Sequence, residues 1–168
     1  MRPSSQPTEL IVRYFAKRDV PPEESWRLLD WCAKNGADEF TINGMVAGSE
    51  GRKSAAFFAS LAPYERTEAP RRRLSAPNAD EFVRSTQLWT LSAHTMALLR
   101  GAMRDGVFDY NTGGDPWLED LAVYRRGEFM MGVITHEDGG VLRITSAEVA
   151  ELDRMGFPHK DEVAWIGY

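Results

Sequence analysis

Residues 116–157 predict a three-stranded antiparallel sheet followed by a helix, and they read PWLEDLAVYRRGEFMMGVITHEDGGVLRITSAEVAELDRMGF. Three runs rich in β-branched and aromatic side chains predict the strands: Leu118 to Tyr124, Glu128 to His136 and Val141 to Ile144. Arg125-Arg126-Gly127 separates the first two runs, and Asp138-Gly139, between the second and third, is a strong hairpin signal. The region is therefore expected to form a β-meander.

A helix is expected to follow the third strand. Thr145-Ser146-Ala147-Glu148 has the spacing of a capping box, in which the first and fourth side chains satisfy each other's backbone N–H groups. Val149 and Leu152 begin an apolar side, and Gly156 with Phe157 is typical of a helix end. We expect this helix to fold back onto the meander.

Alternation along the strands predicts which side of the meander is the core, if both hairpins have two-residue turns. The expected core side holds Leu118, Ala122, Tyr124, Phe129, Met131, Val133, Leu142 and Ile144, together with Asp120 and Thr135. The other side holds Trp117, Glu119, Leu121, Val123, Met130, Gly132, Ile134, His136, Val141 and Arg143. On that mixed side Glu119 is expected diagonal to His136 and in the same row as Arg143.

The rest of the chain carries signals for further strands and helices. Strands are expected over 9–16, 38–46 and 86–91. Helices are expected from a first turn at Pro21-Pro22 to a stop at Asn35-Gly36, from Asn78, and from Ser92 to Arg104. Ser54 to Leu61 is ambiguous, because its alanines suit a helix whereas Phe57-Phe58 equally suits the return strand of a hairpin. Residues 1–168 are thus expected to form a single α+β domain, with a mixed or antiparallel sheet covered by about three helices. Residues 1–8 are expected to be a disordered arm and residues 63–78 an irregular surface connection.

Composition limits the classes of partner. The formal net charge of -5 and a pI near 5.3 argue against binding to nucleic acid or to anionic lipid through bulk electrostatic attraction. Cys32 is the only cysteine, so the chain forms no internal disulfide and is expected to be cytoplasmic. No apolar run reaches the length of a membrane-spanning helix, which predicts no membrane partner.

The sequence predicts no metal and no cofactor. His136, Glu137 and Asp138 are consecutive, so alternation points them to opposite sides, and His94 and His159 are remote in sequence. The loop from Gly48 to Ser54 follows a predicted strand but lacks the glycine that a phosphate-binding loop needs before its lysine. Arg71-Arg72-Arg73 has no interleaved aromatic side chains and is expected to be a solvated loop.

These observations favour a non-catalytic binding module that engages another protein through acidic and aromatic surface, and an inhibitor or immunity-type protein is one such class. The expected binding residues are Trp117, Glu119, Asp120, His136 and Arg143, and none is assigned a catalytic role. One alternative is a small hydrolase-like enzyme in which Glu119 orients His136 as a general base beside Arg143. A second alternative is a sensor that binds a small ligand over the mixed side of the sheet.

Overall fold

The structure is a computed structural model that describes residues 9–44, 51–66, 87–109 and 118–162, with the side chains of 51 and 52 excepted. Its strands are β1 Leu10–Ala16, β2 Glu39–Gly44, β3 Trp89–Thr90, β4 Leu118–Arg125, β5 Glu128–Ile134 and β6 Gly139–Thr145. Its helices are α1 Pro22–Lys34, α2 Gly51–Leu61, α4 Ala93–Ala102 and α5 Ser146–Met155. Short 3₁₀ turns η1 Lys17–Asp19, η2 Ala62–Tyr64 and η3 Thr135–Glu137 complete the described elements.

All the described strands belong to one six-stranded sheet in the order β1-β6-β5-β4-β2-β3. Each neighbouring pair is antiparallel, and the C-terminal meander β4-β5-β6 lies at the centre. The sheet and its helices form a single α+β domain, as the sequence predicts. The first and last strands of the meander pair with β2 and β1, which come from the N-terminal part of the chain.

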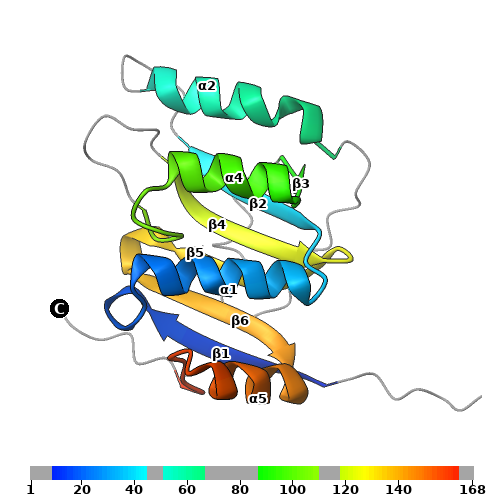
Figure 1. Cartoon of the computed structure of the whole chain (residues 1–168), viewed down its shortest axis with the longest axis vertical. Coiled ribbons are helices and arrows are strands. Elements are labelled where there is room, and N and C mark those ends of the chain that lie inside the picture. The colour runs from blue at the N-terminus through cyan, green and yellow to red at the C-terminus, as the bar shows by residue number, and fades with distance from the viewer. Residues whose placement is uncertain (1–8, 45–50, 67–86, 110–117, 163–168) are drawn as a thin grey trace, which may run out of the picture.

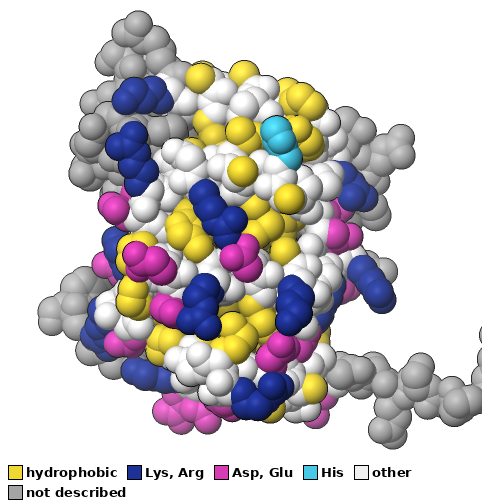
Figure 2. Space-filling view, viewed as in Figure 1, with side chains coloured by type: hydrophobic (Ala, Val, Ile, Leu, Met, Phe, Trp, Pro, Cys, Tyr) yellow, Lys and Arg dark blue, Asp and Glu magenta, His cyan; other side chains and the backbone are white. Residues whose placement is uncertain are grey.

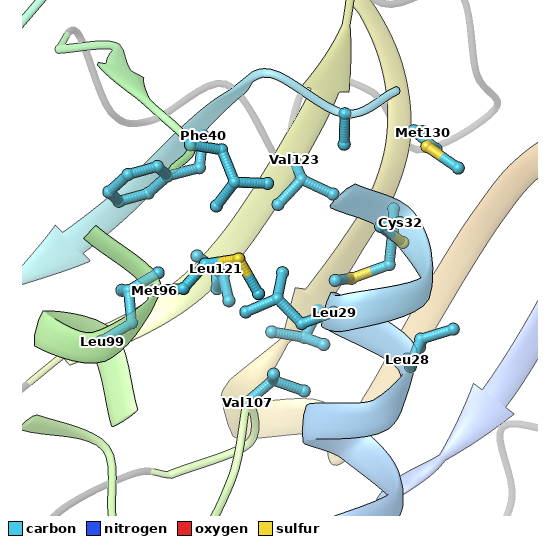
Figure 3. Close-up of a cluster of buried hydrophobic side chains, with 14 of the residues drawn as sticks. Leu28, Leu29, Cys32, Phe40, Met96, Leu99, Val107, Leu121, Val123 and Met130 are labelled. Atoms are coloured by element: carbon cyan, nitrogen blue, oxygen red, sulfur yellow. The ribbon is translucent and has the colours of Figure 1, made fainter. Parts of the chain in front are cut away.

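The described helices pack on one face of this sheet. Leu28 of α1, Phe57 of α2, Leu99 of α4 and Leu152 of α5 all belong to the same buried cluster as the strand residues that face them. In Figure 1 the helices form a layer along the sheet, with α1 and α4 in front of the central strands. Figure 3 shows side chains of α1 and α4 meeting those of β2, β4 and β5 within this cluster. This face is the main hydrophobic core.

Local sequence explains where these helices begin and end. Pro22 stands at the first position of α1, where its missing N–H costs nothing, and Glu23 and Glu24 follow in the first turn. Capping boxes begin α4, through Ser92 and Thr95, and α5, through Thr145 and Glu148. None of the described helices is long and apolar enough to cross a membrane.

A second apolar cluster lies on the opposite face of the sheet. Ala122, Phe129, Ile134 and Val141 are buried there, with Val12, Tyr14 and Tyr124 packed against them. No described helix contributes a side chain to this cluster. The meander is therefore apolar on both faces, whereas the sequence prediction assigned it one core face and one mixed face.

Two irregularities of β4 explain the difference. The register shifts between Val123 and Tyr124, where β5 has an extra residue, and again between Thr41 and Asn43 of β2, where β4 has one. A shift of one residue exchanges the faces of the strand beyond it. Leu118, Met131, Val133, Leu142 and Ile144 lie in the main core as predicted. The predicted sides of Leu121, Ala122, Val123, Tyr124, Phe129 and Met130 were wrong.

The second hairpin also differs from the prediction. Ile134 pairs with Gly139, so the turn contains the four residues from Thr135 to Asp138 and not two. Thr135 begins the turn η3, and Asp138 closes it in the left-handed conformation at φ 51°. The turn is centred two residues earlier than Asp138-Gly139, so β6 is shifted along β5 by four positions from the expected register.

The ambiguous run from Ser54 is helical, and it adds α2 to the about three helices expected. The strand expected over 86–91 is present as β3, whose two residues pair with β2. The described beginning of the expected irregular connection forms η2, after which Glu65 bridges to Trp89. The expected arm over 1–8, the helix from Asn78 and residues 67–78 lie outside the described residues.

We predict that Gly140→Ala destabilises the fold, because a Cβ built at Gly140 lies 2.2 Å from Cζ of Phe15. Phe15 is buried against Phe108 and Phe157, so its ring has little room to move. We expect a loss of about 2 kcal/mol in the free energy of unfolding, measured by urea titration. Gly101→Ala is the control: its Cβ meets nothing within 4 Å in a helix, so it should stabilise slightly. Equal effects of the two substitutions would contradict the assignment.

Candidate functional site

Glu119 and Arg143, which were expected in one row with His136 diagonal to Glu119, lie in different rows of the sheet. Glu119 pairs with Asn43 of β2 near the start of β4, level with the end of β5. Arg143 pairs with Val12 of β1 and lies four positions along β6 from Gly139, about 13 Å at the rise of a strand. The expected proximity of Glu119 to Arg143 was wrong, because the turn after β5 has four residues.

His136 lies in the turn η3 and not on a strand. Its side chain is half exposed, and its Nε2 is 3.8 Å from the carboxylate of the neighbouring Glu137. This contact within one turn is the local pairing that consecutive His and Glu residues commonly make. Trp117, the remaining aromatic member of the predicted site, lies outside the described residues.

Asp120 is a buried structural residue, although the sequence placed it in a binding surface. Its carboxylate accepts a hydrogen bond from the backbone N–H of Thr135 at 3.0 Å, and its own N–H donates to Oγ1 of Thr135 at 2.8 Å. Nδ2 of Asn43 donates to its second oxygen at 3.3 Å. Asp120 also has φ 55°, a left-handed conformation that Asp tolerates better than most residues. The two hydrogen bonds between Asp120 and Thr135 fix the point where β5 ends, at Ile134, and hold the irregular part of β4 in place.

A second set of polar contacts joins β4, α5 and the end of α1. Arg125, at the end of β4, donates to both carboxylate oxygens of Glu148 and, at 3.1 Å, to the backbone oxygen of Asn35 that follows α1. Burial alone would raise the pKa of Glu148, but hydrogen bonds from Arg125 and Thr145 outweigh it and hold that pKa below its usual range. Cys32 lies buried nearby, and its burial raises the pKa of its thiol, so it is not an activated nucleophile.

Glu39 on β2 is a buried carboxyl group whose pKa is shifted in the opposite direction to that of Glu148. Burial raises its pKa, Arg66 lowers it less, and Asp38 raises it further. Nη2 of Arg66 is 3.3 Å from the carboxylate, and 46% of the Arg66 side chain is exposed. Further along β2, Oγ1 of Thr41 lies 3.4 Å from the hydroxyl oxygen of Tyr124 on β4. The contact between Arg66 and Glu39 ties the residues after η2 to β2.

The surface formed by α2, η2 and α4 has a different character from the rest of the described exterior. Residues 54–64 and 88–99 contain no Asp, Glu, Lys or Arg, and both runs reach the surface through these helices. The exposed members are small or aromatic: Ala55, Ala56, Ala59, Ser60, Ala62, Pro63, Ala93, His94 and Ala97, with Phe58, Tyr64 and Leu98 partly buried. We call this set the α2–α4 surface. Figure 2 shows uncharged atoms and one histidine over this part of the molecule, with charged side chains at its margins.

Two ring stacks fix the aromatic members of the α2–α4 surface. Tyr64 of η2 stacks on His94 of α4, with ring centroids 5.2 Å apart at 28°. Phe58 of α2 stacks on Trp89 of β3 at 5.6 Å and 30°. Rings held in this way lose little conformational freedom when a partner covers them. The sequence prediction missed this surface, although the two charge-free runs were visible in it.

The described residues hold no group of three or more His, Cys, Asp or Glu side chains that could bind a metal ion. His94 stacks on Tyr64, whereas His159 lies 3.2 Å from Asp153 beyond α5, so these two imidazoles belong to different parts of the fold. No protein-family model, curated protein or solved structure matches this chain. The case for function therefore rests on the geometry of the described residues.

We predict that Asp120→Asn preserves most of the stability of the fold and that Asp120→Ala does not. Asn keeps an oxygen for the Thr135 N–H and tolerates positive φ, whereas Ala leaves that buried N–H unpaired and is strained at φ 55°. The expected loss for Ala is about 3 kcal/mol in urea unfolding. A loss of the same size for both variants would show that charge, not hydrogen bonding, is what Asp120 provides.

Glu148→Gln and Glu39→Gln should change the pH dependence of stability in opposite senses. The lowered pKa of Glu148 gives stability above the ordinary carboxyl pKa that is lost in acid, so Gln costs about 2 kcal/mol at pH about 7 and less below pH about 4. The raised pKa of Glu39 gives stability in acid that is lost as pH rises through that pKa, so Gln should match or exceed the parent near neutrality. Urea titrations of both variants across this range would check the signs, and trends of the same sign would contradict them.

Proposed function

We propose that this protein is a non-catalytic interaction module that binds another protein through the α2–α4 surface. The observation that carries the proposal is the absence of any formal charge over residues 54–64 and 88–99, which supply two adjacent surface elements of a chain that is 27% charged. The centres of protein interfaces are depleted of charged residues, because desolvating a charge costs free energy. Lone exposed apolar residues are ordinary, but a contiguous set is typical of a contact surface.

The packing beneath the α2–α4 surface supports a preformed contact area. Phe57 and Leu61 of α2 and Met96 and Leu99 of α4 are buried in the main core, so both helices are anchored from below. Alanine side chains occupy much of the outer side, and they have no rotamer freedom to lose on binding. A partner would therefore meet a rigid surface, which lowers the entropic cost of association.

The surface proposed here differs from the acidic one expected from the sequence. Asp120 is buried and accepts hydrogen bonds from Thr135 and Asn43. His136 and Arg143 lie on elements that do not belong to the α2–α4 surface. An inhibitor or immunity-type role remains a hypothesis from composition. The hydrolase hypothesis loses its geometric support, because it required Glu119, His136 and Arg143 to converge.

Replacing Ala59 with Arg should abolish capture of the partner while leaving the fold intact. Ala59 is exposed on α2, and an arginine there puts a charge in the centre of the contact that must be desolvated, which we expect to weaken binding at least about tenfold. Ala150→Arg, at an exposed position of α5, is the matched control. The measurement is affinity capture from the source cells with quantitative mass spectrometry.

Circular dichroism would verify that both variants are folded. Partners that are retained equally by parent, Ala59→Arg and Ala150→Arg would show that the α2–α4 surface is not the binding site. The absence of any partner with the parent protein would count against the proposed function itself.

A further inference from the structure

We infer that the outer edge of β1 binds an extended peptide segment of another protein, which pairs with β1 as an additional antiparallel strand. In Figure 1 β1 is the outermost strand at the end of the sheet where α5 lies. The α2–α4 surface lies beside β3, at the other end of the sheet. The edge of β1 is therefore a second site, and the inference does not depend on the proposed function.

The hydrogen bonds of Tyr14 show which backbone groups of β1 point outward. Its N–H and its carbonyl oxygen both pair with Lys160 at 2.8 Å, on the side away from β6. Outward and inward groups alternate along an antiparallel strand, so those of Leu10 and Val12 also point away from β6. Within the described part of the chain nothing pairs with them, because the bridge at Tyr14 is isolated and the chain bends at Asp161 and Glu162.

β1 lacks most of the features that usually prevent a sheet edge from pairing with another chain. Protected edges are short, interrupted by a bulge or a proline, charged, or covered. The opposite edge strand, β3, has two residues, and Glu65 bridges to it. β1 has seven residues without proline, with Arg13 as the one charged residue, and it pairs with β6 without a register shift. Its regular geometry suits an added strand.

The neighbouring side chains define the apolar part of the partner. Ile11 packs against the main core and Val12 against the second apolar cluster, and both are partly exposed. An added strand would place its alternate side chains beside Ile11 on one face and beside Val12 on the other. β-branched or aromatic residues at these positions would extend both apolar clusters by one strand.

Arg143 adds a preference for one acidic side chain. It is opposite Val12 on β6, is partly exposed, and has no ion pair with any other residue that the structure describes. The residue that pairs with Val12 on an added strand would lie in the same row, about 10 Å from Arg143, which Glu and Arg side chains can bridge together. Glu9 and Glu162 are exposed nearby, so a single carboxylate suits this site better than an acidic run.

Peptides selected from a random phage-displayed library against the full chain are the probes. We expect sequences in which one Asp or Glu adjoins β-branched or aromatic residues, with Kd values of about 1 μM or weaker, because few backbone hydrogen bonds are gained. On an isotope-labelled chain, a bound peptide should slow hydrogen exchange of the Leu10 and Val12 amides at least about tenfold. N-methylation of the peptide residues that face the edge should abolish binding.

Val12→Pro should weaken peptide binding at least about tenfold and keep the sheet, because it removes an outward N–H that β6 does not use. Arg143→Gln should weaken binding of the acidic peptides about fivefold and leave binding of their uncharged Glu→Gln forms unchanged. Arg27→Gln, at an exposed position of α1, is the matched control and should have no effect. If Val12→Pro proves unfolded by circular dichroism, the methylated peptides and Arg143→Gln decide.

Three outcomes would overturn the inference. One is that no peptide is enriched, and another is that bound peptides protect amides other than those of Leu10 and Val12. The third is slow exchange of both amides in the free chain, which would mean that the chain itself or a second copy already occupies the edge. Ala59→Arg should leave peptide binding unchanged, so capture that fails only with Ala59→Arg would support the proposed function whatever the fate of this site.

Discussion

The ion pair of Arg125 and Glu148 is the interaction on which the arrangement of sheet and helices depends. Glu148 also belongs to the capping box that begins α5, and Arg125 also donates to the backbone oxygen of Asn35, the residue that follows α1. One partly buried contact therefore links the end of β4, the start of α5 and the end of α1. Removing either partner would leave a largely buried charge unpaired, which costs more than the pair itself contributes.

The sequence predicts the elements of the fold better than their registers. Capping residues and turn signals act locally, which is why β1, α1, α4 and α5 lie where they were expected. The faces of β4 depend on bulges near Asp120 and Met130, and these follow from long-range contacts such as that between Asp120 and Thr135. No local pattern signals that an Asp within an apolar strand will adopt positive φ to pair with a residue of the next strand.

The expected row of Glu119 and Arg143 was wrong for the same reason. Glu119 was expected in one row with Arg143 and diagonal to His136, and the residues that share a row depend on the position and length of the turn. Asp138-Gly139 is a strong two-residue turn signal, but Thr135 has its N–H bound to Asp120, so β5 ends at Ile134 and the turn takes four residues. The ionisable residues that the sequence singled out mostly serve architecture, whereas the surface that carries the proposed function has no charge at all.

The absence of charged residues made α2 ambiguous in the sequence, and the same absence supports the proposed function. An edge helix normally has a polar outer side, and that periodicity is how a helix is recognised. From Ser54 to Tyr64 the outer side is alanine, serine and proline, so the run has no charged stripe and resembles a buried strand. The structure places this run on the outside of the molecule as a helix. A surface helix without charged side chains exposes apolar area to water, which is unfavourable. Contact with a partner would remove that area from water.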